Sequence, residues 1–295
     1  MDNPSPSSPP PLELTKSRIA TLATFAAATV IWIPVAGETS GVASKISHVL
    51  GFAVWLSCVI LVLRDSSTKL RRRMGILLGC IALLAFCDIQ TSLSDANFFR
   101  LGIPFGICAF LPAIIMARTD PGVIRYRFWP GNFRKIDVIY TILSIPLAWL
   151  VLKFYGWANL ALFNDQLFSH WTMPPEMDPI QIRRLFVGIN MVGIWDELFF
   201  VNVVYATLRS LFSYRVSNAL QAVVYTSVLF DMAFTGAGVV IVAIFAWTQG
   251  SMFEKSESLL WVLIVHLIVD FFLVAAIVNF YYPGTGMGIL LRHGM

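Results

Sequence analysis

Long apolar runs separated by short polar connections set the pattern of this sequence. The runs fall at about 19–36, 46–63, 74–92, 101–116, 137–156, 185–207, 217–234, 236–250 and 258–280. Backbone groups in lipid must find their hydrogen-bond partners within the segment, so such runs are expected to be helices. No strand-length stretch alternates as a membrane barrel does. Because a span needs about 20 apolar residues, the pattern predicts an all-α transmembrane bundle that crosses the bilayer about eight or nine times.

Composition excludes a water-soluble protein. Hydrophobic residues make up 57% of the 295 and charged residues only 13%, whereas a soluble domain usually has about a quarter of its residues charged. Basic residues lie between the apolar runs and form no stripe, which argues against nucleic-acid binding. Cys58, Cys80, Cys87 and Cys108 lie within apolar runs, without a CxxC pair. They are expected to be packing residues, and no disulfide framework, metal site or cofactor is predicted.

Basic residues crowd the second and fourth connections. They are Arg64, Lys69, Arg71, Arg72 and Arg73 in the first of these, and Arg118, Arg125, Arg127, Arg134 and Lys135 in the other. Because cytoplasmic loops carry the excess of Lys and Arg, both loops and the N-terminus are expected to be cytoplasmic. Arg209 and Arg215, after the sixth run, agree with this orientation, whereas Arg183 and Arg184, before it, disagree.

Composition also suggests how the chain is divided. Residues 1–16 are rich in Pro and Ser and have no apolar periodicity, which predicts a disordered tail. The basic, aromatic segment RYRFWPGNFRK at 125–135 is the one marked change of composition along the chain and indicates a boundary. We therefore expect an N-terminal transmembrane bundle at 17–130, a transmembrane core at 131–282 and a flexible tail at 283–295.

Candidate chemistry is concentrated in the last four runs, which contain four carboxyl groups and one imidazole. These residues are Asp196, Glu197, Asp231, His266 and Asp270. A charged group at the centre of a membrane helix costs about 2.5–3.5 kcal/mol on insertion scales, so each needs a reason. His266 and Asp270 are four residues apart and share a helix face. Asp196 and Glu197 point about 100° apart, so one can face the bundle centre while the other contacts a neighbouring helix.

At these residues the chain resembles the CPBP family of CaaX-protease and bacteriocin-processing intramembrane peptidases. That family has EExxxR in one span, FxxxH in the next and HxxxN or HxxxD in the last. The corresponding stretches here are DELFFV from Asp196 to Val201, FDMAF from Phe230 to Phe234, and HLIVD from His266 to Asp270. The resemblance covers about 185–275 and implies a four-helix core of the CPBP type.

The resemblance implies a catalytic mechanism. A Glu of the first motif and the His of the second activate water, while the third motif stabilises the oxyanion of the scissile amide. Carried over to this chain, Asp196 takes the base position, Glu197 is the second acid, and His266 with Asp270 forms the oxyanion side. Asp231 could supply a further carboxylate beside Asp196 and share a proton with it.

Departures from the family pattern weaken that reading. Asp196 is one methylene shorter than Glu, Val201 replaces the Arg, and Phe234 stands at the position assigned to the catalytic His. Asp270 can donate a hydrogen bond to an oxyanion only when it is protonated.

Structural roles also stay open for these polar residues. His266 and Asp270 can be a hydrogen-bonded pair that ties helices together. Asp231 can be a polar group at a helix end, and Asp196 and Glu197 can serve packing alone.

Three function classes follow. The lost His and Arg favour a catalytically degraded relative that binds a membrane partner, and this is the reading we expect. Family resemblance favours an active endopeptidase that cleaves a membrane-associated peptide or protein. A transporter with a carboxylate relay is a third class, but no repeats or broken helices support it. Expected partners are the lipid bilayer and another membrane protein or membrane-associated peptide, in the inner (plasma) membrane of a bacterium, without nucleic acid.

Overall fold

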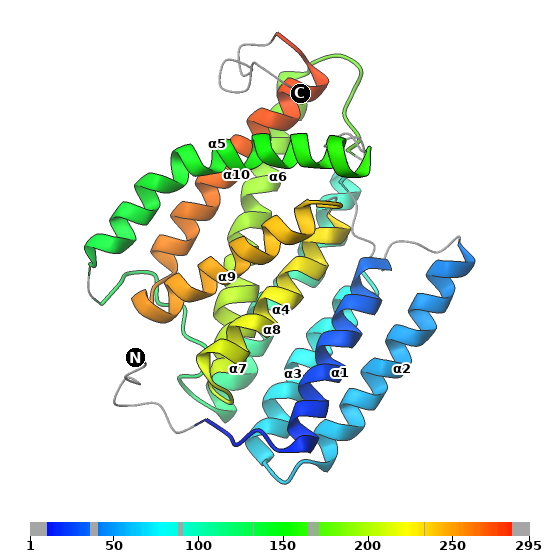
Figure 1. The fold of residues 1–295 in the computed structure, drawn as a ribbon, viewed down its shortest axis with the longest axis vertical. Coiled ribbons are helices and arrows are strands. Elements are labelled where there is room, and N and C mark those ends of the chain that lie inside the picture. Colours follow the sequence, from blue (N-terminus) through cyan, green and yellow to red (C-terminus); the bar gives the residue numbers. More distant parts are fainter. Residues whose placement is uncertain are drawn as a thin grey trace.

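The structure, a computed structural model, describes residues 11–35, 41–87, 91–131, 133–164, 168, 171–232 and 234–284. Over these residues every regular element is a helix, so the all-α prediction is confirmed. The helices are α1 (Lys16–Trp32), α2 (Val42–Arg64), α3 (Thr68–Ala85), α4 (Asp95–Thr119), α5 (Lys135–Phe163), α6 (Pro179–Asp196), α7 (Ala206–Arg209), α8 (Tyr214–Asp231), α9 (Gly238–Ser256) and α10 (Leu259–Tyr281) (Figure 1). A 3-10 turn, η1 (Ile33–Val35), follows α1, and a π-helix, η2 (Glu197–Tyr205), joins α6 to α7.

Five helical segments are long and apolar enough to cross a membrane. They are α2, α4, α5, the continuous rod Pro179–Arg209 and α10. The remaining expected spans coincide with α1, α3, α8 and α9, so a total of eight or nine crossings stays a prediction. Residues 1–10 and 285–295, in the two expected tails, lie outside the described residues.

Short polar side chains mark where several helices begin. Ser67, Ser94 and Ser258 each precede a helix, and each hydroxyl accepts a hydrogen bond from a backbone N–H of the first turn. Asp178 caps α6 in the same way, and Pro179 follows at the first helical position. Such caps satisfy N–H groups that have no partner inside the helix. They allow each connection to reverse the chain within a few residues.

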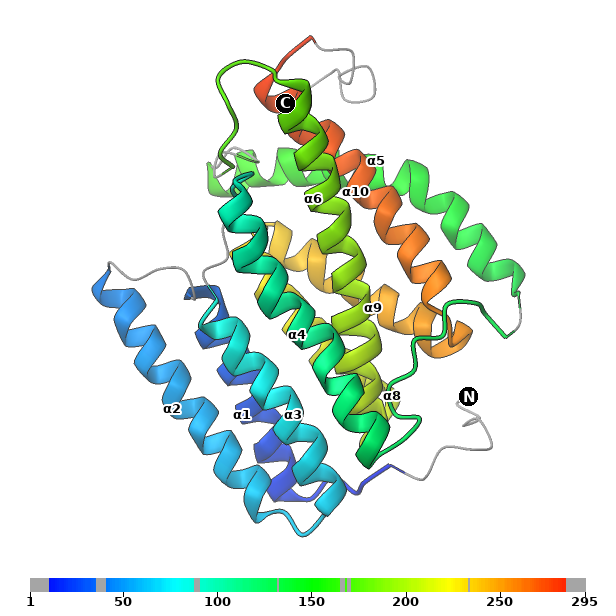
Figure 2. The same cartoon turned by 180° about the vertical axis from the view of Figure 1, so that it is seen from behind.

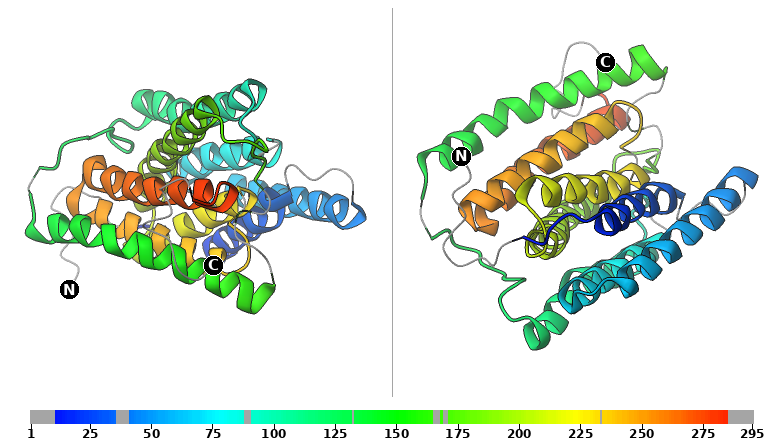
Figure 3. Two further views of the ribbon diagram at one scale, coloured as in Figure 1. Left: turned by 90° about the horizontal axis from the view of Figure 1, so that it is seen from above. Right: turned by 60° about the horizontal axis from the view of Figure 1, so that its bottom comes forward.

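The candidate site is formed by the C-terminal helices together with α4. α10 packs between α5 and α6, as the view from above makes plain (Figure 3). α8 packs along α9 and also contacts α1, and α4 lies beside α6 (Figure 2). Because α4 belongs to the expected N-terminal bundle, that bundle contributes a wall to the core instead of standing apart from it.

Ion pairs gather the basic connections at one end of the bundle. Arg18 Nε lies 2.9 Å from Asp65 Oδ2, which joins the start of α1 to the α2–α3 connection. Arg73 Nε lies 3.1 Å from Asp120 Oδ2, beyond α4, and Arg73 also donates to the Ser210 carbonyl. The second and fourth connections and the α7–α8 turn therefore share one end, as the predicted orientation requires.

Arg183 and Arg184, whose position disagrees with the predicted orientation, lie at the opposite end of the bundle. Arg184, in the second turn of α6, lies 3.0 Å from Asp95 at the start of α4. Its charge is therefore balanced locally, and the pair joins the two helix starts at that end.

Orientation can be tested with Ser67→Cys and Gly131→Cys, which lie in the second and fourth connections. Both should react with a membrane-impermeant maleimide only after the cytoplasmic face is opened, because these loops carry the excess of basic residues. Ala96→Cys, exposed in the first turn of α4, is the control and should react in intact cells. Reaction of Ser67→Cys with reagent added outside intact cells would contradict the predicted orientation.

A second test concerns Asp65. The hydrogen bond from Arg18 is the largest cause that holds the pKa of Asp65 below its usual value, against the opposing effect of burial. Its contribution to stability is present above the unfolded pKa of about 4 and is lost as the pH falls through the lower folded pKa. Asp65→Asn should therefore destabilise the protein by about 1.5–3 kcal/mol at pH 7, with the difference shrinking under acid conditions. Detergent melting curves measure this, with the exposed Glu176→Gln as control; an equal difference at all pH values would contradict it.

Candidate active site

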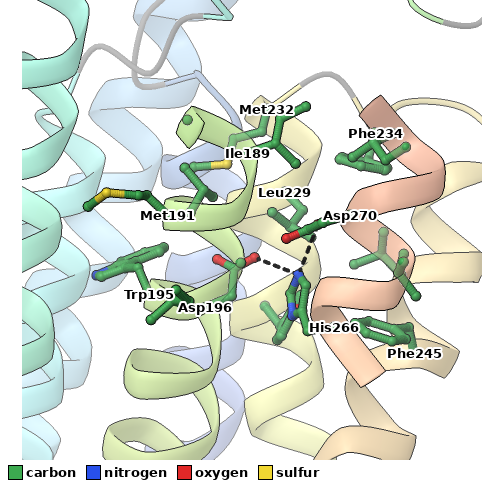
Figure 4. Close-up of a pocket in the computed structure, with 18 of the residues that line it drawn as sticks. Ile189, Met191, Trp195, Asp196, Leu229, Met232, Phe234, Phe245, His266 and Asp270 are labelled. Atoms are coloured by element: carbon green, nitrogen blue, oxygen red, sulfur yellow. Dashed lines mark hydrogen bonds and ion pairs between the residues drawn. The ribbon is translucent and has the colours of Figure 1, made fainter. Parts of the chain in front are cut away.

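An imidazole lies at the centre of the candidate site, and three carboxyl groups surround it. His266 Nδ1 is 2.7 Å from Glu197 Oε1, while its Nε2 is 3.6 Å from both Asp196 Oδ2 and Asp270 Oδ1. Figure 4 shows Asp196 and Asp270 approaching the same nitrogen from α6 and α10. All four residues are at most 5% exposed. The structure therefore brings together four of the five residues that the sequence singled out.

Two residues that the sequence reasoning missed also belong to the polar cluster, one bonded to Glu197 and one to His266. Gln249, from α9, donates to Glu197 Oε1 at 2.9 Å and also donates to the Val262 carbonyl on α10. Tyr225 OH, from α8, lies 3.2 Å from His266 Nδ1. Gln249 and Tyr225 are both polar side chains within apolar runs, and this is the sequence signal that could have pointed to them. The charge partner that Glu197 loses with Val201 is thus replaced by His266, with Gln249 in support.

The helix containing the two adjacent acids changes its winding at this site. The rod is α-helical to Asp196 and π-helical from Glu197 to Tyr205. Such wide turns are rare and occur frequently at functional sites. Asp196 reaches Nε2 and Glu197 reaches Nδ1, so the two neighbours hold opposite nitrogens of one ring. Their different directions agree with the angle expected between adjacent helical residues.

Gly193, one turn before Glu197, provides the space for the cluster. A Cβ at this position would lie 2.0 Å from Asp270 Oδ2 and 2.9 Å from His266 Cδ2. No side chain larger than hydrogen fits there without moving the site residues. α6 and α10 therefore approach closely only because this residue is glycine.

A cavity of about 770 Å³ borders the cluster. Its wall is mostly apolar and comes from α4, α5, α6, α8, α9 and α10. Asp196, His266 and Asp270 are the ionisable acids and bases on that wall, whereas Glu197 lies behind it. The site thus presents two carboxyl groups and one imidazole to an apolar space, with a third carboxyl group supporting them.

The cavity reaches the lipid-facing surface of the bundle. Several of its lining side chains are also large, exposed hydrophobic groups, namely Phe110, Leu147, Phe154, Met191, Ile194 and Ile244. α4 packs on α3 and α6, and α5 packs on α9 and α10, yet both helices line the cavity. The cavity is therefore open at the apolar outer surface of the bundle.

Asp231 and Phe234 lie at and beyond the end of α8. The helix ends at Asp231, whose side chain lies outside the described residues, so its contribution stays a prediction. Phe234 follows that end and stacks on Tyr155, with ring centroids 6.3 Å apart. It lines the cavity without being part of the α8 face that meets His266.

That α8 face carries a different pair of residues. Tyr225 and Leu229 both line the cavity and are four residues apart, the spacing of the FxxxH motif. Leu229 lines the same cavity as Asp270 and Asp196 (Figure 4). Leu229 is thus on the α8 face that meets His266, whereas Phe234 lies beyond the end of the helix. The assignment of the second-motif His position to Phe234 stays a prediction.

The segment that contains this site matches a known protein family. Residues 179–272 match the family model described as type II CAAX prenyl endopeptidase Rce1-like. This confirms the CPBP resemblance. The Rce1-like segment begins at α6 and ends within α10, so it contains all four clustered residues. With its membrane-length apolar helices, the chain is an integral membrane protein. Comparisons with curated proteins and with solved structures gave no match.

The site as described holds no group suited to a metal ion. Among the residues that the structure describes, no set of three or more His, Cys, Asp or Glu side chains has the geometry for it.

Gly193→Ala tests the close approach at the site. The new methyl group should displace the Asp270 carboxyl and lower thermal stability in detergent by about 1–3 kcal/mol, the usual cost of overpacking. Gly106→Ala, which lines the same cavity where nothing lies within 4 Å, is the matched control. Combining Gly193→Ala with Asp270→Ala should recover part of the loss, because the clashing carboxyl is gone. Equal melting curves for both Gly variants would contradict the crowding.

Proposed function

We propose that this chain is an intramembrane endopeptidase that hydrolyses an amide bond of a membrane-associated peptide. The observation that carries the proposal is the position of Asp196 and Asp270, both 3.6 Å from His266 Nε2 on the wall of an apolar cavity. A purely structural cluster would have no need to face open space. The Rce1-like match supports the same reaction class.

The two aspartates can divide the work of an acid and a base. Carboxyl groups close together in a low dielectric share a proton, as in the aspartic proteases. The ionised member takes a proton from water as the water oxygen bonds to the carbonyl carbon. The protonated member donates a hydrogen bond to the carbonyl oxygen, where negative charge develops. A proton then passes to the amide nitrogen as the C–N bond breaks.

His266 and Glu197 position this pair. Glu197 accepts a hydrogen bond from Nδ1–H, which fixes the ring and aims Nε2 at both aspartates. When the ring is protonated, its charge is balanced by Glu197, and its Nε2–H stabilises the ionised aspartate. Burial makes this balance necessary, because an unpaired charge at this depth is costly.

The cavity favours a substrate with an apolar portion. His266 is seven residues from the start of α10, or about 10 Å at the helical rise. That start is bonded to the basic fourth connection, because Leu259 N–H donates to the Arg127 carbonyl. A scissile bond at the acids would therefore lie near the predicted cytoplasmic end. The apolar portion would extend along the cavity toward Asn97 and Trp171 at the other end.

One observation favours the second candidate, a degraded peptidase that binds a membrane partner. Phe234, which the resemblance matches to the catalytic His, and Leu229, on the same cavity wall, are both apolar. Neither side chain can accept a proton or form a hydrogen bond with water. On this reading the cluster holds the helices together, and the cavity binds a partner's lipid or helix without cleaving it.

Activity separates the two candidates. The purified chain in liposomes should cleave a lipidated C-terminal reporter peptide, and Asp196→Asn or Asp270→Asn should lower kcat by at least about 100-fold, as the loss of a general acid or base does. The control, Asp178→Asn, makes the same chemical change at an N-cap outside the cavity, where Asn also caps. Folding is checked by size-exclusion chromatography, since an unpaired His266 could unfold the protein.

If the wild-type chain binds the reporter without cleaving it, the degraded reading holds. Phe234→His or Leu229→His, each with Asp196→Glu, should then create activity, and the variant that does so identifies the residue at the family's His position.

A further inference from the structure

A polar stripe runs along one face of α8 and ends at the imidazole. Tyr214, Asn218, Gln221 and Tyr225 follow one another at intervals of four, three and four residues, which is one helix face. The stripe begins next to the α7–α8 turn, at the end where the basic connections gather. It extends about 16 Å along the helix. Its last member, Tyr225, contacts His266 Nδ1.

Much of the polar surface along this stripe has no protein partner. Within the described part of the chain, this is true of Ser217 Oγ, Asn218 Oδ1 and both amide atoms of Gln221. It is equally true of both amide atoms of Asn202, five residues after Glu197 on η2. All four residues are 0% exposed. Buried polar groups in proteins are otherwise bonded to protein or to ordered water.

Neighbouring residues connect the stripe at both ends. Near its start, Tyr214 OH lies 2.6 Å from Ser251 Oγ, and Asn218 donates to Ser251 Oγ at 3.2 Å. Further in, a Cβ on Gly250 would lie 2.0 Å from Asn218 Oδ1 and 3.2 Å from Gln221 Oε1. Glycine therefore gives the two amides their room against α9.

The adjacent residue on α9 links the stripe to the acids. Gln249 is the residue next to Gly250. Its Oε1 has no hydrogen-bond partner among the described groups, and its Nε2 donates to Glu197. Polar atoms thus extend from the half-buried Tyr214 to the carboxyl group that holds His266.

Except at Tyr225, which lines both, the stripe is separate from the apolar cavity. Asn218, Gln221 and Gln249 are not part of the cavity wall, and neither is Glu197. Asp196 and Asp270 line the cavity, whereas Glu197 is bonded to Gln249, the neighbour of the Gly250 against which the stripe amides pack. The cluster therefore has an apolar approach on one side and a polar approach on the other.

We propose that the polar stripe of α8 holds a file of water molecules connecting the aqueous face at Tyr214 with Glu197 and His266. The waters bond to the free amide and hydroxyl atoms and provide a route for water and protons that does not pass through the lipid-facing cavity. This inference goes beyond the proposed function, because the route would supply the cluster whether or not it hydrolyses peptides.

Cysteine accessibility tests the route. Ser217→Cys, Asn218→Cys and Gln221→Cys are each treated with a small, charged methanethiosulfonate from the face at which Tyr214 lies. Such reagents need the thiolate, which forms in water and not in a dry interior. The depth-matched control is Leu220→Cys, between these positions but in the apolar core of the bundle. The wild-type chain, whose four cysteines are buried, gives the background.

The stripe positions should react at least tenfold faster than Leu220→Cys. Reaction of all positions at the slow rate of the control would overturn the proposal, since the stripe would then be dry. If the amide variants fail to fold, Ser217→Cys decides the question, because it exchanges a single atom. The labelling does not depend on cleavage, so the two proposals can fail separately. Rapid labelling of a chain without activity would contradict only the proposed peptidase function. Slow labelling of an active chain would contradict only the water route.

Discussion

Charge balance around His266 is the constraint on which the core depends. A buried ion without a partner is expensive, and three carboxyl groups around one imidazole can be stable only in a few protonation states. The ring meets this requirement by bonding to Glu197 with one nitrogen and approaching two aspartates with the other. Removing His266 would leave three buried carboxyl groups without a positive partner, and removing Glu197 would leave Nδ1 without its carboxylate.

Several features of the fold serve that balance. Gly193 removes a side chain where α6 meets α10, and Gln249 extends the network to α9. The π-helical turn beginning at Glu197 widens the rod at the residue that bonds to the ring. Gln249 is far from Gly193 and Glu197 in the sequence, yet all three act at the same cluster. The cluster is thus the joint between four helical segments as well as the candidate chemical centre.

The sequence predicted a large part of this arrangement because the membrane penalises polar groups so strongly. Apolar runs located the helices, and ionisable residues inside them identified Asp196, Glu197, His266 and Asp270. The i, i+4 spacing correctly paired the last two. Here the physical rule is simple, since a charge in lipid must have a partner.

Prediction failed where the answer depended on packing between distant segments. Nothing in the sequence marks the end of α8 at Asp231, so it does not reveal that Phe234 lies beyond that helix. Gln249 and Tyr225 are neutral and therefore drew less attention than the acids, although both contact the cluster. The need for Gly193 appears only when α6 and α10 are placed together. Contacts of this kind are decided by tertiary geometry, which one-dimensional patterns do not encode.

Exposed side chains of α4, α5 and α6 form part of the cavity wall, so under the proposed function the bilayer is the solvent from which a ligand arrives. Occupancy then depends on how many ligand molecules lie in each unit of membrane area, not on their concentration in water. A weak intrinsic affinity is sufficient for a lipid-anchored molecule that is already confined to two dimensions. A water-soluble analogue of the same shape would first have to partition into the membrane. Selectivity therefore begins in the lipid phase, before any contact with the protein.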